Sequence, residues 1–222
     1  MWPGKGGGVA VSNGPAKLDL RKVYKALYSP SAKTVSVVDV PDLAFIMLDG
    51  SVEPGSSPSN SEGFRRGIEA MYGISYGVKF ISKLRAVDPV DFTVMTLEGL
   101  WPLWEGGTPP AGAPMDFTLL MMQPDHVTDE MVRMAVDQGA ARHANPLLEH
   151  VRLERWREGL CLQVMHVGPY ADEPRTMERL ASYAAEHAYR NRGRHHEIYL
   201  GDPRRARPEN LRTILRQPVS AA

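Results

Sequence analysis

The sequence predicts an α+β protein in which antiparallel strands alternate with amphipathic helices. Short apolar runs bounded by Gly, Pro and Asp are typical of strands, and longer segments place apolar residues at helical spacing. The order strand, helix, strand, strand occurs in both halves of the 222-residue chain. Each unit would bury one sheet face under its own helix. The two units would join most simply into one body, with a ligand cleft at the seam.

The first half begins with an expected strand over residues 43–49, an apolar run that ends in Asp-Gly. A long helix follows, because Ser59 and Glu62 have the spacing of a capping box. Strands are expected next over residues 91–97 and 117–123. The apolar face of the helix consists of Phe64, Ile68, Met71, Val78 and Ile81.

A loop rich in Gly and Pro, WPLWEGGTPPAGAP, separates the last two of these strands. Trp101 and Trp104 are unusual in a solvated loop, so we expect this segment to cover part of the molecule. A core position and a pocket-lining position stay open for each tryptophan. Thr128 then caps a helix that extends to about Arg142 and links the two halves.

The second half repeats the order of the first. We expect a strand over residues 160–167, a helix that Pro174 opens and Gly193 closes, and strands over residues 196–200 and 211–217.

The resulting division of the chain has a flexible tail over residues 1–17 and a single domain over residues 18–219. Its two modules cover approximately residues 35–125 and 150–219.

Charge and cysteine content exclude several classes of function. Lys plus Arg and Asp plus Glu both total 26, so no net field favours nucleic acid or membranes, and the arginine-rich last quarter lacks a recognised reader helix. The single cysteine, Cys161, excludes an internal disulfide framework and is interpreted as an inert core thiol. With neither a signal peptide nor a membrane span evident, we expect a cytoplasmic protein.

The segment HHEIYL places polar residues on both faces of one strand. Side chains alternate, so Ile198 and Leu200 face the core together with His196, whereas Glu197 and Tyr199 face solvent or the seam. His195 shares a face with Glu197 but not with His196, so the two histidines cannot chelate one ion, and no metal site is expected.

Carboxylates and aromatic residues also occur together elsewhere, as Glu98 with Trp101 and as Tyr170 with Glu173. This combination suits a flat, electron-poor or cationic ligand, since rings supply stacking area and the carboxylate supplies charge or a base. His166 precedes a Gly-Pro turn, where it is either a satisfied polar residue or a donor to the pocket.

Five segments together carry a resemblance to a known family: LYSP (27–30), LEGLW (97–101), MMQPD (121–125), EGLCLQVMHVGPYADEP (158–174) and HHEIYLGDPRRARPENLRTILRQPV (195–219). They resemble the GyrI-like proteins, a group that includes cyclopropanoid cyclopropyl hydrolases. The resemblance extends from Lys17 to Val219. It implies two strand-helix-strand-strand (SHS2) modules, a central cleft, and a glutamate at position 197 that projects into this cleft between aromatic walls. No metal or organic cofactor is implied.

The resemblance implies a hydrolase that detoxifies DNA-alkylating compounds by adding water to their cyclopropane ring. Glu197 would activate the water, and Glu173 or Tyr170 would assist as second carboxylate or donor. Glu98 and His166 are further candidate contacts for a flat hydrophobic ligand. Two alternatives stay open: a non-catalytic drug-binding protein, and an effector-sensing partner of a transcription regulator. Trp101, Trp104 and Tyr199 would clamp the ligand.

Overall fold

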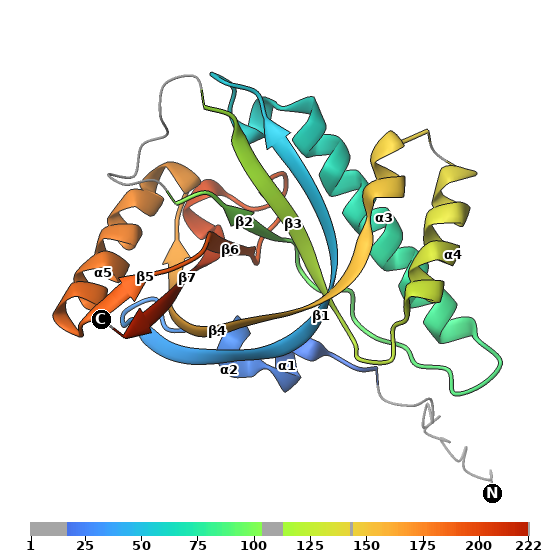
Figure 1. The fold of residues 1–222 in the computed structure, drawn as a ribbon, viewed down its shortest axis with the longest axis horizontal. Helices are drawn as coiled ribbons and strands as arrows, with labels where there is room; N and C mark the ends of the chain where they lie inside the picture. Colours follow the sequence, from blue (N-terminus) through green and yellow to red (C-terminus); the bar gives the residue numbers. More distant parts are fainter. Residues whose placement is uncertain (1–16, 104–112, 143, 222) are drawn as a thin grey trace, which may run out of the picture.

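A computed structural model describes residues 17–103, 113–142 and 144–221. It confirms the predicted α+β class, with helices packed around an antiparallel sheet (Figure 1). The helices are α1 (Leu20–Val23), α2 (Lys25–Tyr28), α3 (Glu62–Leu84), α4 (Asp129–Ala140) and α5 (Glu173–Glu186). The strands are β1 (Ser36–Val52), β2 (Glu98–Trp101), β3 (Met115–Gln123), β4 (Arg152–Val167), β5 (Tyr189–Asn191), β6 (His195–Tyr199) and β7 (Arg212–Ala221).

The described strands form one sheet in the order β4-β1-β3-β2-β6-β7-β5, and β4 also pairs with β7. The sheet therefore closes on itself and has an inner and an outer face. Strands from the two halves of the chain are joined at two places, where β1 pairs with β4 and β2 pairs with β6. Both halves follow the order strand, helix, strand, strand, with β5 inserted in the second half.

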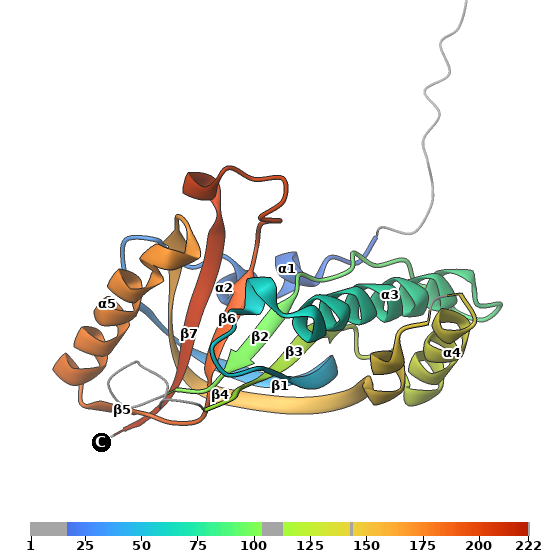
Figure 2. The same cartoon turned by 90° about the horizontal axis from the view of Figure 1, so that it is seen from above.

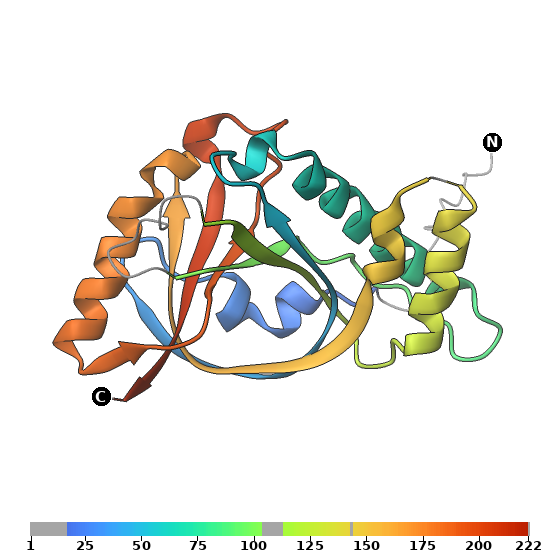
Figure 3. The same cartoon turned by 45° about the horizontal axis from the view of Figure 1, so that its top comes forward.

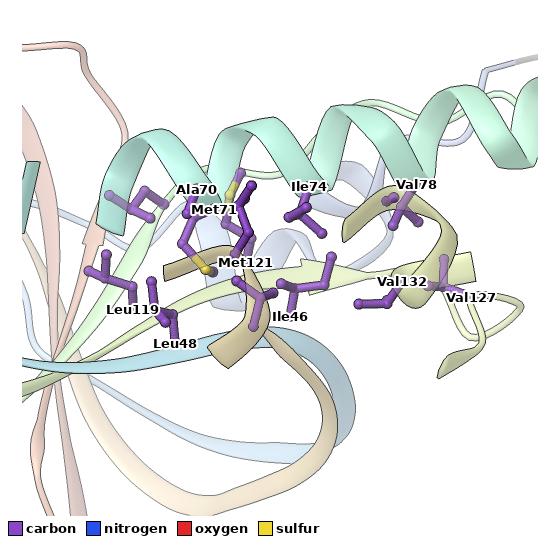
Figure 4. Packing of buried hydrophobic residues seen from close by; sticks show 14 of the residues in the cluster. Ile46, Leu48, Ala70, Met71, Ile74, Val78, Leu119, Met121, Val127 and Val132 are labelled. Atoms are coloured by element: carbon purple, nitrogen blue, oxygen red, sulfur yellow. The ribbon is translucent and has the colours of Figure 1, made fainter. Parts of the chain in front are cut away.

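Helices cover the sheet from different sides. Helix α3 packs on the outer face of β1 and β3 (Figure 4), helix α5 packs on β4 and β7, and β6 and β2 lie between these two helices (Figure 2). The short helices α1 and α2 lie against the inner face (Figure 3), where Leu27 and Tyr28 join a core with Leu120 and Ile214. The part of the chain that is described contains no helix apolar and long enough to span a membrane.

Two strands are longer than their apolar runs predict. Strand β1 begins at Ser36 rather than at residue 43, and β4 begins at Arg152 rather than at residue 160. Ion pairs between the two strands, such as Asp42 with Arg155 at 2.7 Å, carry the pairing beyond the apolar segments.

Three local predictions are wrong. Helix α3 is capped by Ser61, whose Oγ accepts from the Phe64 N–H, and not by Ser59. The strand expected over residues 91–97 lies at Glu98–Trp101 instead, because the backbone around residues 91–93 bonds to Leu18. Helix α5 ends at Glu186, well before Gly193, since the backbone turns left-handed at residue 188 and β5 follows.

Candidate functional site

Strand β6 carries polar side chains on two separate faces, as its alternation predicts. His196 and Ile198 point to the inner face, where Ile198 joins the core beneath α1 and α2. His195, Glu197 and Tyr199 point to the outer face, where Tyr199 packs against the core beneath α3 and Glu197 interacts with Glu173 at the start of α5.

On the outer face, hydrogen bonds connect an indole, a phenol and a carboxylate. Trp101 Nε1–H donates to the Tyr199 hydroxyl oxygen at 2.9 Å, and the Tyr199 hydroxyl donates to Glu197 Oε2 at 2.8 Å. The Tyr170 ring meets the Tyr199 ring edge-on, with centroids 6.1 Å apart. The Glu197 carboxylate is thus held in one orientation beside aromatic rings, and its side chain is 18% exposed.

A second carboxyl, that of Glu173 at the start of α5, interacts with Glu197. Burial and then the charge of Glu197 raise the pKa of Glu173 to about 8, with the Thr213 side chain acting in the opposite direction. Burial also raises the pKa of Glu197, against the Tyr199 hydrogen bond and the charge of His196. With a pKa of about 8, Glu173 keeps its proton near neutral pH, and ionisation of either carboxyl opposes ionisation of the other.

Buried polar atoms without a hydrogen-bond partner collect on the same face. Among the described residues, four such side-chain atoms occur, and three of them belong to His195 (Nδ1), Glu173 (Oε1) and Gln217 (Oε1). Gln217 follows Arg216, the cross-strand partner of His196, so its side chain shares the outer face with His195. Since buried polar groups in proteins are normally paired, this concentration indicates a site that a polar ligand completes.

The inner face carries a different polar cluster, in which the partners are complete. His196 Nε2–H donates to Glu98 at 2.9 Å, and its Nδ1–H donates to Glu158 at 3.1 Å. Arg216 donates to Glu158 at 3.2 Å, and the Tyr28 hydroxyl donates to Glu98 at 2.7 Å. We call these five residues the inner network; each is at most 3% exposed.

Charges within the inner network balance. Although burial acts against the charged ring, Glu158 and then Glu98 raise the pKa of His196 to about 9. Burial likewise opposes the charged form of Glu158, but His196 and Arg216 lower its pKa to about 2. Two carboxylates therefore face two cations at neutral pH, an arrangement suited to holding strands together.

The remaining sequence-predicted residues lie in several places. Glu98 belongs to the inner network, so the structure does not bring it to Glu197. His166 is buried with both ring nitrogens engaged, Nδ1 at 2.9 Å from Thr176 Oγ1 and Nε2 at 3.1 Å from the Pro169 carbonyl. Trp101 packs against Phe64 and Phe117 as well as donating to Tyr199, whereas Trp104 lies outside the described residues.

Sequence reasoning missed Glu158 and Arg216. Both are charged residues at inward positions of otherwise apolar strands, in EGLCLQV and LRTILRQPV. A charged residue on the apolar face of a strand predicts a buried ion pair, because buried charges occur almost only when paired.

Two hollows of the described surface lie away from Glu197. One, of about 510 Å³, is lined by residues of α1 and α2 together with Leu200 and Arg212. Another, of about 380 Å³, lies beside α5, next to Lys33 and Arg179. The predicted cleft at Glu197 therefore stays a prediction. Within the described ranges, no three His, Cys, Asp or Glu side chains are arranged to hold a metal ion.

The incompletely paired polar face of this closed α+β sheet is suited to binding a small molecule. Residues 114–220 match the GyrI-like small molecule binding domain. An uncharacterized conserved protein from Listeria innocua is 33% identical, with a TM-score of 0.81, over 92% of this chain and 100% of that one. The chain belongs to the GyrI-like family.

Other solved structures are also similar. A hydrolase from Listeria innocua is 33% identical to this chain, with a TM-score of 0.78 and the same coverage of 92% and 100%. The C-terminal domain of EcmrR, at 11% identity and a TM-score of 0.52 over 85% of this chain and 98% of that one, shares the fold. No curated protein sequence matches the chain.

Proposed function

We propose that this protein is a hydrolase that opens the cyclopropane ring of DNA-alkylating cyclopropanoid compounds by adding water. The observation that carries the proposal is the presence, on the outer face of the sheet, of two partly buried carboxyls, Glu197 and Glu173, whose pKa values are both raised by burial. The similarity to a Listeria innocua protein that is itself named a hydrolase supports catalysis. The biological role would be detoxification of such compounds in the cytoplasm.

The two carboxyls would take opposite roles. A cyclopropane conjugated to a dienone opens when a nucleophile attacks a ring carbon and negative charge develops on the ketone oxygen. Glu197 would accept a proton from water as the carbon–oxygen bond forms and the ring carbon–carbon bond breaks. Glu173, whose raised pKa keeps it protonated, would donate its proton to the developing phenolate. Water is thereby added, and both carboxyls exchange protonation states.

Aromatic residues around the pair would hold a flat ligand. Trp101 and Tyr199 are linked by a hydrogen bond, and Tyr170, 40% exposed, packs edge-on against Tyr199. Such rings supply stacking area at small entropic cost and exclude water, which strengthens the polar contacts between them. Tyr170 is the second candidate donor, although burial and then Glu173 raise its pKa to about 12, so Glu173 is the stronger acid.

The proposal is tested by incubating the protein with a spirocyclopropyl cyclohexadienone and following the water adduct by mass spectrometry. We expect an adduct well above the buffer rate. A Glu209→Gln variant, altered at an exposed glutamate in the connection between β6 and β7, is the matched control and should keep the wild-type rate. If no adduct forms above the buffer rate, the hydrolase proposal is wrong.

A non-catalytic binding protein is the second candidate, which the family's description as a small molecule binding domain favours. It would use the same outer face. Its signature is saturable quenching of tryptophan fluorescence by flat or cationic compounds, with the compound recovered unchanged.

A further inference from the structure

His195 faces Glu197 along the same side of β6. Its Nε2 lies 3.8 Å from Glu197 Oε1, which is too far for a direct hydrogen bond. Two polar atoms at this separation can both lie within hydrogen-bond distance of one small group placed between them. The His195 side chain is only 8% exposed, so its orientation is fixed by packing.

Gln217 shares the outer face with His195, and its side-chain oxygen has no hydrogen-bond partner among the described residues. The Gln217 amide nitrogen donates to the backbone carbonyls of Arg192 and Pro218, each at 3.2 Å, so its Oε1 is left as an acceptor. Burial lowers the pKa of His195, and Gln217 acts in the opposite direction. With the ring proton on Nδ1, Nε2 presents a lone pair toward Glu197.

The His195 ring is neutral near pH 7. Burial, and then the charge of His196, lower its pKa to about 4. When Glu197 is a carboxylate, it and the neutral imidazole place two acceptors opposite each other. The group that satisfies two acceptors at once must donate two hydrogens, and water is the smallest such group.

We propose that His195 and Glu197 together hold the attacking water, which makes His195 a further catalytic residue. The inference rests on the proposed function. Water would donate one O–H to His195 Nε2 and one to Glu197 Oε1, which leaves its lone pairs free to attack the ring carbon. As the new carbon–oxygen bond forms, the proton passes to Glu197, the ring bond's electrons reach the ketone oxygen, and Glu173 protonates that oxygen. His195 stays neutral throughout.

The test compares two substitutions at position 195 in the full chain. His195→Asn places an amide only near the former Nδ1 and removes the Nε2 acceptor, whereas His195→Gln can place an amide oxygen near Nε2. With the spirocyclopropyl cyclohexadienone as probe, we expect kcat of the Asn variant to fall roughly ten- to a hundredfold with KM little changed. The Gln variant should recover a large part of kcat.

A competition between nucleophiles separates water positioning from a structural role. With methanol added, the ratio of methanol adduct to water adduct should rise in the Asn variant, because ordered water has lost one of its two acceptors. Should that variant fail to fold, His195→Phe, which keeps the ring shape, serves in its place.

The outcomes distinguish the two proposals. A wild-type protein that forms no adduct overturns the proposed function and with it this inference. A wild-type protein that forms the adduct, with an Asn variant of unchanged kcat and an unchanged adduct ratio, overturns the role of His195 alone.

Discussion

The two faces of β6 use similar residue types for different purposes. On the inner face, His196 lies between Glu98 and Glu158, and every ring nitrogen and carboxylate has a partner at hydrogen-bond distance. On the outer face, His195 and Glu197 are 3.8 Å apart, and several buried polar atoms have no partner among the described residues. Completed pairing indicates a structural role, while incomplete pairing indicates a site that is completed by a ligand.

The two faces of β6 also differ in charge balance. The inner network sets two cations against two carboxylates. The outer face brings the carboxyls of Glu173 and Glu197 together, and burial raises the pKa of both. The outer face is thus less favourable to the fold than the inner one, as is common where residues are arranged for chemistry.

The largest expected effect is on catalysis, from Glu197→Gln. Without the base, water is no longer deprotonated as it attacks, so we expect turnover of the cyclopropane probe to fall roughly 100- to 10,000-fold. The melting temperature should be unchanged or higher, since the substitution removes a desolvated carboxylate. Mass spectrometry of the adduct and a thermal melt check both expectations. Retention of the full rate would remove Glu197 from the mechanism.

On the inner face, Glu158→Gln should instead lower stability. It leaves the buried cations His196 and Arg216 with one carboxylate between them, and breaking a buried ion pair in this way costs about 3–5 kcal/mol. Urea unfolding of this variant beside Glu197→Gln measures the contrast directly. Equal stability of the two variants would contradict the division of roles between the faces.

The pH dependence should follow Glu173. As a general acid with a pKa of about 8, it acts while protonated, so the rate should fall about tenfold per pH unit above that value. Its folded pKa lies above the unfolded value of 4.5, so the stability it contributes is fully present below pH 4.5 and is lost as pH rises through 8.

We expect Glu173→Gln to remove the pH dependence that Glu173 gives to the rate and to the stability. We expect a lower rate without the alkaline limb, and a smaller decline in unfolding free energy between pH 4.5 and 8 than in the wild type. Rate profiles and urea titrations at several pH values provide the measurement. An alkaline limb that persists unchanged in this variant would assign it to another group.

The smallest effect is expected from Tyr199→Phe. This change removes the hydroxyl that donates to Glu197 and accepts from Trp101, while the ring keeps its packing. Loss of a hydrogen bond to a charged group is worth about 1.5–3 kcal/mol, so kcat should fall roughly 10- to 100-fold. Steady-state kinetics beside Tyr76→Phe, which alters an exposed tyrosine, gives the comparison. Identical kinetics in both variants would show that Glu197 needs no such support.

Strand alternation predicted the division of β6 into two faces, because a period of two residues depends on local backbone geometry alone. It could not predict what lies opposite each face. The partners of His196 come from positions 98 and 158, and Glu173 comes from a helix start, so these contacts depend on how the strands of both halves pair. The same dependence explains why the strand prediction over residues 91–97 is wrong. The backbone partner of residues 91–93 is Leu18, which is more than 70 residues away in sequence.

The closure of the sheet has a consequence for any shortened form of the protein. The segment that matches the family, residues 114–220, contains β3 to β7 but neither β1 nor β2. In a fragment with those boundaries β3 would lose both of its described neighbours, and β4 and β6 would each present an unpaired edge. Unpaired edges template association between chains. Such a fragment is expected to aggregate, so the smallest piece that can be expressed and assayed includes β1 and β2.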